Sequence, residues 1–152
     1  MERRFTIEPQ GLPDLPGMML ATVEALKEIG GSATIQELDE KVAELEGVTE
    51  EEQSFAMPNN NRQPRFNYYL SWARTYLKRG GALENSARGV WALTEFGKRI
   101  TEYDQTKKIH EQVNAEERER ARRKRAEAKV KKDNGQDNGR IAPSSDEMSP
   151  DQ

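Results

Sequence analysis

Bulky apolar side chains are confined to the first two thirds of this chain, and that partition limits which part of it can fold. All ten aromatic residues lie between Phe5 and Tyr103, whereas residues 111–152 hold only nine apolar side chains in 42 positions. A segment so poor in apolar surface cannot offset the entropy that it loses on ordering. The predicted segments are a flexible arm (1–14), one domain (15–105), a charged helical tail (106–132) and a disordered tail (133–152).

Charge is distributed as unevenly as hydrophobicity. The net charge is only −3, but residues 1–61 carry −9 and residues 62–110 carry +6. This asymmetry indicates a polyanionic partner for the basic part or, equally, ordinary surface charge. Without cysteine, and with His110 as the single histidine, the chain is not expected to hold a metal, and we expect no other cofactor. No apolar run approaches the roughly 20 residues of a membrane span, so we expect a cytoplasmic protein with no membrane partner.

Helical spacing and turn residues predict the order of the elements. Three helical patterns end at Gly30, Gly47 and Gly80, where glycine suits a helix C-terminus. The second starts at a capping box formed by Thr34 and Glu37, and its apolar positions begin with Ile35. The other expected pieces are an extended Ser32–Ala33, a helical turn at Thr49–Glu52, a loop over 57–61, a hairpin formed by 82–84 and 90–93, and a last helix that brings Phe96 and Ile100 to the core.

This order, three helices followed by a two-stranded hairpin, is typical of a winged helix-turn-helix domain. The predicted fold class is therefore mainly α with a small β-hairpin (α+β). In that architecture the third helix enters the major groove of DNA and the hairpin reaches the neighbouring backbone or minor groove.

The third helix has an apolar face and a face without acidic residues. Trp72 is expected in the core with Trp91 of the hairpin, whereas Asn67, Ser71, Arg74 and Lys78 recur at helical spacing on the other side. Asn and Arg can pair with base edges, and Lys and Ser can hold phosphates. The candidate DNA-contacting residues are Arg65, Asn67, Tyr68, Ser71, Arg74, Thr75, Lys78, Arg79 and, at the hairpin turn, Arg88. The alternative is that this stripe is simply the solvated side of an amphipathic helix.

Four stretches carry a resemblance to a known family. They are Gly31–Leu38 (GSATIQEL), Leu70–Lys78 (LSWARTYLK), Arg88–Trp91 (RGVW) and Leu93–Gly97 (LTEFG). Together they resemble the N-terminal winged-helix domain of Mrr-type restriction endonucleases over roughly residues 15–103. The resemblance implies DNA binding ahead of a separate nuclease domain, and this sequence has no counterpart of that nuclease domain. Tyr69 stands where the family usually has Arg.

Two functional hypotheses follow from the sequence. The first is a non-catalytic module that binds double-stranded DNA, as a transcription regulator or as the targeting part of a restriction or defence system with a nuclease or other effector as partner. The second is a protein–protein interaction or adaptor module, since winged helices also bind proteins. Residues 118–132 carry a net charge of +7, which indicates either an auxiliary nucleic-acid tail or a solvated helix. The oligomeric state is left open.

Overall fold

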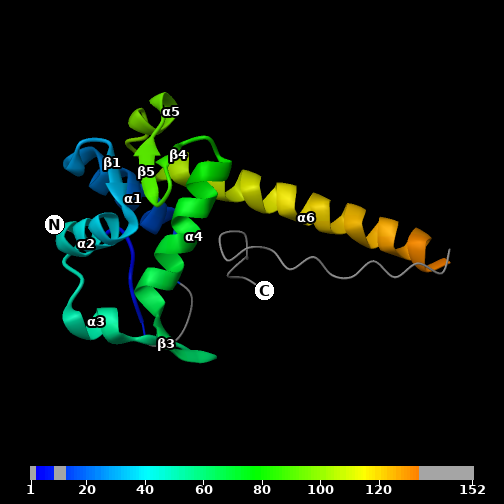
Figure 1. The fold of residues 1–152 in the computed structure, drawn as a ribbon, viewed down its shortest axis with the longest axis horizontal. Helices are drawn as coiled ribbons and strands as arrows, with labels where there is room; N and C mark the ends of the chain where they lie inside the picture. Colours follow the sequence, from blue (N-terminus) through cyan, green and yellow to red (C-terminus); the bar gives the residue numbers. More distant parts are fainter. Residues whose placement is uncertain (1–2, 9–12, 134–152) are drawn as a thin grey trace.

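The computed structural model describes residues 3–8 and 13–133 of the chain (Figure 1). It is mostly helical with two small antiparallel sheets, which confirms the predicted α+β class. The elements are α1 (Leu15–Ile29), β1 (Ser32–Thr34), α2 (Ile35–Glu46), α3 (Glu50–Ser54), β2 (Ala56–Met57), β3 (Asn60–Pro64), α4 (Arg65–Arg79), β4 (Leu83–Ala87), β5 (Val90–Leu93), α5 (Glu95–Lys98) and α6 (Tyr103–Asp133). Apart from Asp133, which ends α6, the segment expected to be disordered lies outside the described residues.

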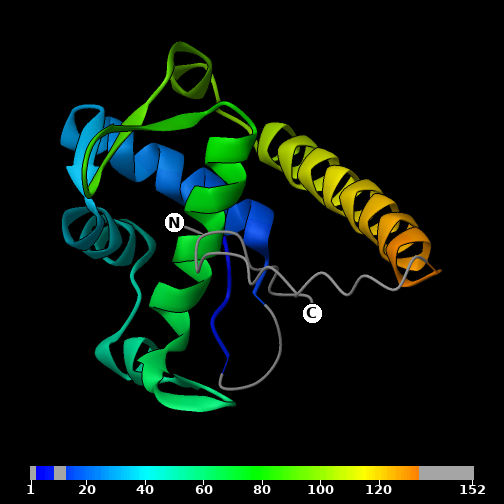
Figure 2. The same cartoon turned by 45° about the vertical axis from the view of Figure 1, so that its right-hand side comes forward.

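The main sheet has the strand order β1-β5-β4, and all its pairs are antiparallel. Trp91 at its centre lies opposite Ala33 of β1 and Asn85 of β4. The predicted hairpin and the extended Ser32–Ala33 are thus confirmed, and the structure adds that they form one sheet. Figure 2 shows the hairpin running from the C-terminal end of α4 back towards β1.

The helix ends follow the local sequence signals. Both capping boxes form, Thr34 with Glu37 at α2 and Thr49 with Glu52 at α3. Gly30 closes α1 with a φ of 118°, a left-handed conformation that is strained for residues with a side chain. The capping boxes and the glycine helix end were predictable, because each involves residues only a few positions apart.

The expected loop over residues 57–61 is instead part of a second hairpin, β2–β3. The amide N of Arg65 donates to the carbonyl of Phe55 at 2.6 Å, and the amide N of Arg62 donates to Asn60 Oδ1 at 3.1 Å. The prediction failed because this pairing involves only two residues of β2, which is too short for an alternating pattern to be visible.

The core forms where α4 crosses α1. Phe66, Leu70 and Leu77 of α4 are fully buried, and both Trp72 and Trp91 are buried as expected. Phe96, however, is 41% exposed, so its predicted place in the core is wrong, and Ile35, the first apolar position of α2, is 42% exposed. The turn at α5 packs through Gly97 instead, where a Cβ would lie only 2.1 Å from the carbonyl oxygen of Ala82.

Residues 3–8 form a strap across the domain, so the predicted flexible arm is wrong for this part of the chain. Phe5 and Ile7 are buried, and the Phe5 ring stacks 6.2 Å from Phe66. Arg3 Nη2 donates to Glu52 Oε1 at 2.9 Å, and this hydrogen bond lowers the pKa of Glu52. Two apolar residues among polar neighbours carry no periodic signal, and only the tertiary structure shows the groove that receives them.

The first third of α6 belongs to the domain, which corrects the predicted boundary at residue 105. Thr106, Ile109 and Val113 are buried against α1 and α4. The Thr106 hydroxyl donates to the carbonyl of Pro16 at 2.8 Å. Beyond this packed part, α6 continues away from the rest of the molecule (Figure 1).

Candidate nucleic-acid interface

Lys78 and Arg88 are the predicted contact residues that the structure leaves as exposed cations. Lys78 lies on the last turn of α4, with its Nζ 5.8 Å from the centroid of the Trp91 ring. Arg88 lies in the turn between β4 and β5, only three residues before Trp91. Neither makes an ion pair with another described residue. The end of α4 and the turn of the adjacent hairpin therefore each present one exposed cation.

The outer stripe of α4 is narrower than predicted. Asn67, Tyr68 and Ser71 are half-buried, and of the four stripe positions Asn67, Ser71, Arg74 and Lys78 only Lys78 is exposed. The Ser71 hydroxyl donates to the carbonyl of Tyr68 at 2.5 Å, so its oxygen remains able to accept. The Tyr68 ring packs edge-on against Tyr69 and Trp72, which gives it a core contact as well as a solvent-facing edge.

Arg74 does not project to solvent, so its predicted position facing base edges is wrong. It is only 5% exposed, and its Nη1 donates to Asp39 Oδ1 of α2 at 2.8 Å. Asn67 Nδ2 donates to the other carboxylate oxygen of Asp39 at 2.9 Å. The guanidinium also lies 5.9 Å from the centroid of the Trp91 ring. Arg74 is thus the centre of a polar cluster that joins α2, α4 and β5.

Asp39 is the acidic member of this cluster. Burial raises its pKa, while the nearby Arg74 charge and the hydrogen bonds from Asn67 and Arg74 oppose that rise. A buried carboxylate needs such partners, because transfer out of water penalises its charged form. Since Asp39 lies on α2, whose sequence reads as an acidic amphipathic helix, nothing local marks it as a buried partner of Arg74.

Three further candidate DNA-contacting residues instead make contacts within the protein. Arg65 is buried with its guanidinium 5.8 Å from the Tyr69 ring centroid, so its predicted exposure is wrong. Thr75 is also buried, and its hydroxyl donates to the Ser71 carbonyl at 3.1 Å. Arg79 pairs with Glu117 of α6 and lies 3.8 Å from Glu116. Its charge is therefore largely neutralised within the molecule.

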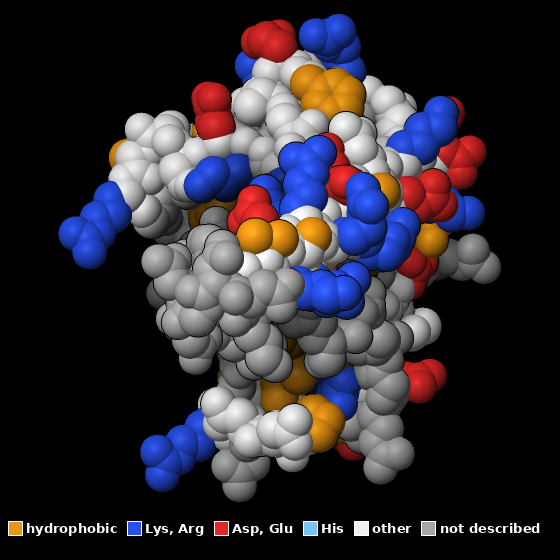
Figure 3. Space-filling model, turned by 90° about the vertical axis from the view of Figure 1, so that its right-hand side faces the viewer, with side chains coloured by type: hydrophobic (Ala, Val, Ile, Leu, Met, Phe, Trp, Pro, Cys, Tyr) orange, Lys and Arg blue, Asp and Glu red, His pale blue; other side chains and the backbone are white. Residues whose placement is uncertain are grey.

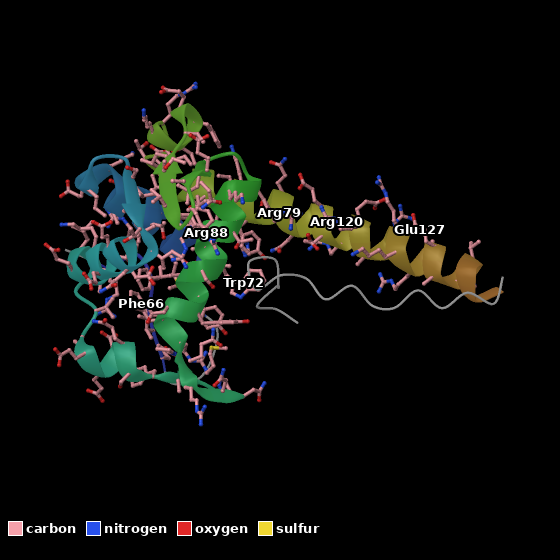
Figure 4. All side chains as sticks on the ribbon, in the orientation of Figure 1. Phe66, Trp72, Arg79, Arg88, Arg120 and Glu127 are labelled. Carbon is pink, nitrogen blue, oxygen red and sulfur yellow. The ribbon has the colours of Figure 1, made fainter. Side chains whose placement is uncertain are left out.

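The α4–α6 junction is a polar seam that sequence reasoning did not foresee. The Tyr76 hydroxyl donates to Asn114 Oδ1 at 2.5 Å, and the Tyr76 ring lies 4.7 Å from the His110 ring. Together with the Arg79–Glu117 ion pair, these contacts hold the base of α6 against the C-terminal half of α4. Figure 4 shows Arg79 at this junction, beside α6. The single histidine is consequently a packing residue.

Further exposed cations lie outside the predicted set. Arg62 is exposed in the β2–β3 hairpin. Viewed from the side towards which α6 extends, Lys and Arg side chains gather around that helix (Figure 3). Among the residues that the structure describes, no group of three or more potential metal ligands is found. None of the described helices is long and apolar enough to cross a bilayer.

Comparison with known protein families gives a match over most of the folded part of the chain. Residues 17–103 match the sequence model of the family described as the Mrr N-terminal domain, a stretch from the first helix to the start of α6. No curated protein and no solved structure matches the chain. The match covers more than half of the 152 residues and includes α4, the hairpin and the Asp39–Arg74 pair.

Proposed function

Because the chain belongs to the Mrr N-terminal domain family, we propose that it is a non-catalytic module that binds double-stranded DNA. Membership associates it with restriction-type systems, and within such a system it would direct an effector such as a nuclease to DNA, or act as a regulator. The proposed contact surface is the outer stripe of α4, with Asn67, Ser71 and Lys78, together with Arg88 of the β4–β5 turn.

The observation that carries this proposal is the order of α4 and the hairpin around Trp91. A helix followed directly by an antiparallel hairpin, in a sheet ordered β1-β5-β4, is the arrangement expected of a winged helix and supports this proposal. In that architecture the helix before the hairpin lies in the major groove. Lys78 lies against the Trp91 ring, and Arg88 lies in the β4–β5 turn three residues before Trp91, so each of the two elements carries an exposed cation.

The roles of the residues follow from their chemistry and exposure. Lys78 and Arg88 are exposed and unpaired among the described residues, which suits them to phosphates. Asn67 and Ser71 offer polar groups at the half-exposed stripe, where base edges would lie. Arg74 acts indirectly, by holding α2 against α4 through Asp39.

The second candidate function is binding to a protein. It is favoured by the exposure of two large apolar side chains, Ile35 and Phe96, near the acidic surface of α2 and at α5 respectively. Such binding would depend far less on salt than DNA binding, because no condensed counterions are released.

The deciding experiment is a duplex titration at several salt concentrations. Lys78→Gln and Arg88→Gln should each weaken binding to all duplexes and lower the slope of log K against log salt by about one unit. Lys41→Gln on the acidic helix α2 removes the same charge and is the matched control; it should leave the slope unchanged. An absence of duplex binding at low salt would reject the DNA proposal and favour the protein partner. Duplex binding that neither replacement weakens would reject the α4–hairpin surface as the contact.

A further inference from the structure

The distal part of α6 carries a basic stripe. Arg118, Arg122, Arg125 and Lys129 follow one another at i, i+4, i+7 and i+11, which places them on one face of the helix. All four side chains are exposed. We refer to these residues as the α6 stripe.

The α6 stripe points away from the domain. Ile109 and Val113 mark the buried side of α6. Arg118 follows Ile109 by nine residues, about 900° of helical rotation at 100° per residue, and therefore lies on the opposite side. Nothing in the described structure covers this face.

Like charges on the α6 stripe destabilise the free helix. Arg118 with Arg122 and Arg125 with Lys129 are i,i+4 pairs of the same sign, which oppose helix formation. Arg122 is compensated by Glu119 at 2.7 Å, whereas Arg118, Arg125 and Lys129 pair with no described acidic residue. Glu127 lies on the opposite face of the helix, and Glu119, at the edge of the stripe, pairs with only one of its four residues, Arg122. A bound polyanion would remove this repulsion along the whole stripe.

We propose that the α6 stripe binds the phosphate backbone of duplex DNA beside the segment contacted by α4 and the hairpin. The inference rests on the proposed function and assigns it a second, sequence-independent contact. From Arg118 to Lys129 the helix rises by about 16 Å, a length over which a duplex presents roughly ten phosphates. The family match ends at residue 103, so this contact is an addition to the family domain.

Two other polyanionic partners fit the α6 stripe less well. An anionic membrane surface requires an apolar face opposite the basic one. Opposite the stripe, distal α6 instead carries exposed Arg120, Arg123 and Glu127. An acidic protein would match the charge, and the test separates it from DNA.

The test compares two triple variants of the full chain that lose the same charge from opposite faces of α6. One replaces Arg118, Arg125 and Lys129 by Gln; the other replaces Arg120, Arg123 and Lys124 by Gln. Each is titrated with a short duplex that covers only the domain and with a longer one. On the longer duplex the stripe variant should lower the salt slope by about two to three units. On the short duplex the stripe variant should have the wild-type affinity and salt slope. The opposite-face variant should keep nearly the wild-type affinity and salt slope on both duplexes.

The outcomes separate this inference from the proposed function. An equal decrease of the salt slope in the two variants would show a general effect of net charge and would overturn the proposed contact through the α6 stripe. A wild-type slope in the stripe variant, with weakened binding in Lys78→Gln and Arg88→Gln, would overturn the stripe alone. The reverse pattern would overturn the α4–hairpin surface and leave the stripe standing. Wild type that binds no duplex would overturn both and favour an acidic protein.

Discussion

At the scale of single residues, two cationic side chains one helical turn apart have opposite environments. Arg74 is buried against Asp39 and the Trp91 ring, whereas Lys78 lies exposed above the same ring. Both belong to the stripe that helical spacing predicted to face outward. What separates them is the carboxylate of α2, which offers Arg74 a desolvated partner that Lys78 lacks.

Replacing Arg74 by Ala should therefore act mainly on stability. The expected loss in the free energy of unfolding is about 3–5 kcal/mol, because the change leaves the buried Asp39 carboxylate without its counter-ion. Lys78→Ala, on the exposed side of the same helix, should change it by no more than about 0.5 kcal/mol. Urea unfolding measures both. A loss below about 1 kcal/mol for Arg74→Ala would mean that the pair contributes no net stability.

At the scale of elements, the N-terminal strap (residues 3–8) packs against the domain, although it lies outside the residues that match the family. The amide N of Arg4 donates a hydrogen bond to Oε1 of Glu46, at the end of α2, at 2.7 Å. Phe5 stacks on Phe66 of α4. Gly17 of α1 allows the Arg4 carbonyl to approach, since a Cβ there would lie 2.0 Å from that oxygen. The strap thus connects α2, α1 and α4.

Truncation of the buried Phe5 side chain in the strap should destabilise the whole domain. Phe5→Ala is expected to cost about 3–5 kcal/mol, the usual range for a buried phenylalanine. Thr6→Ala changes the exposed neighbour and is the control, with an expected effect within about 0.5 kcal/mol. Thermal unfolding of the two variants measures the difference. Similar midpoints for both would mean that residues 3–8 do not stabilise the domain.

At the scale of the whole molecule, α6 is one helix with two roles. Its first turns complete the core through Ile109 and Val113, and its distal turns are exposed on every side. The seam of Tyr76, Asn114 and Arg79 lies between these parts and fixes the direction in which the distal helix leaves.

Truncation should reveal this division. A chain ended after residue 106 loses Ile109 and Val113, and we expect it to lose roughly 3–6 kcal/mol, about 1.5–3 kcal/mol for each buried aliphatic side chain. A chain ended after Arg120 keeps both residues and the Arg79–Glu117 pair, and should stay within about 1 kcal/mol of the full chain. Denaturant unfolding measures the free energy of unfolding of the two truncated chains and of the full chain. Full stability after truncation at residue 106 would show that α6 packing is energetically neutral.

The sequence by itself determined the local features of this protein. The capping boxes at Thr34 and Thr49, the glycine-ended helices and the β4–β5 hairpin depend on interactions between residues a few positions apart. Their signals are therefore visible in a single stretch of chain. The family also followed from such stretches, and its match over residues 17–103 confirms that prediction.

The tertiary structure alone decided the burial of side chains whose partners are distant in the sequence. The strap places Phe5 against Phe66, sixty-one positions away in the chain, and α2 supplies Asp39 to Arg74 across a sequence separation of 35. Helical periodicity reports the face on which a residue lies but carries no information about the distant groups that meet that face. For a charged residue those groups determine its exposure, because desolvation is tolerated only where a partner charge and hydrogen bonds compensate for it.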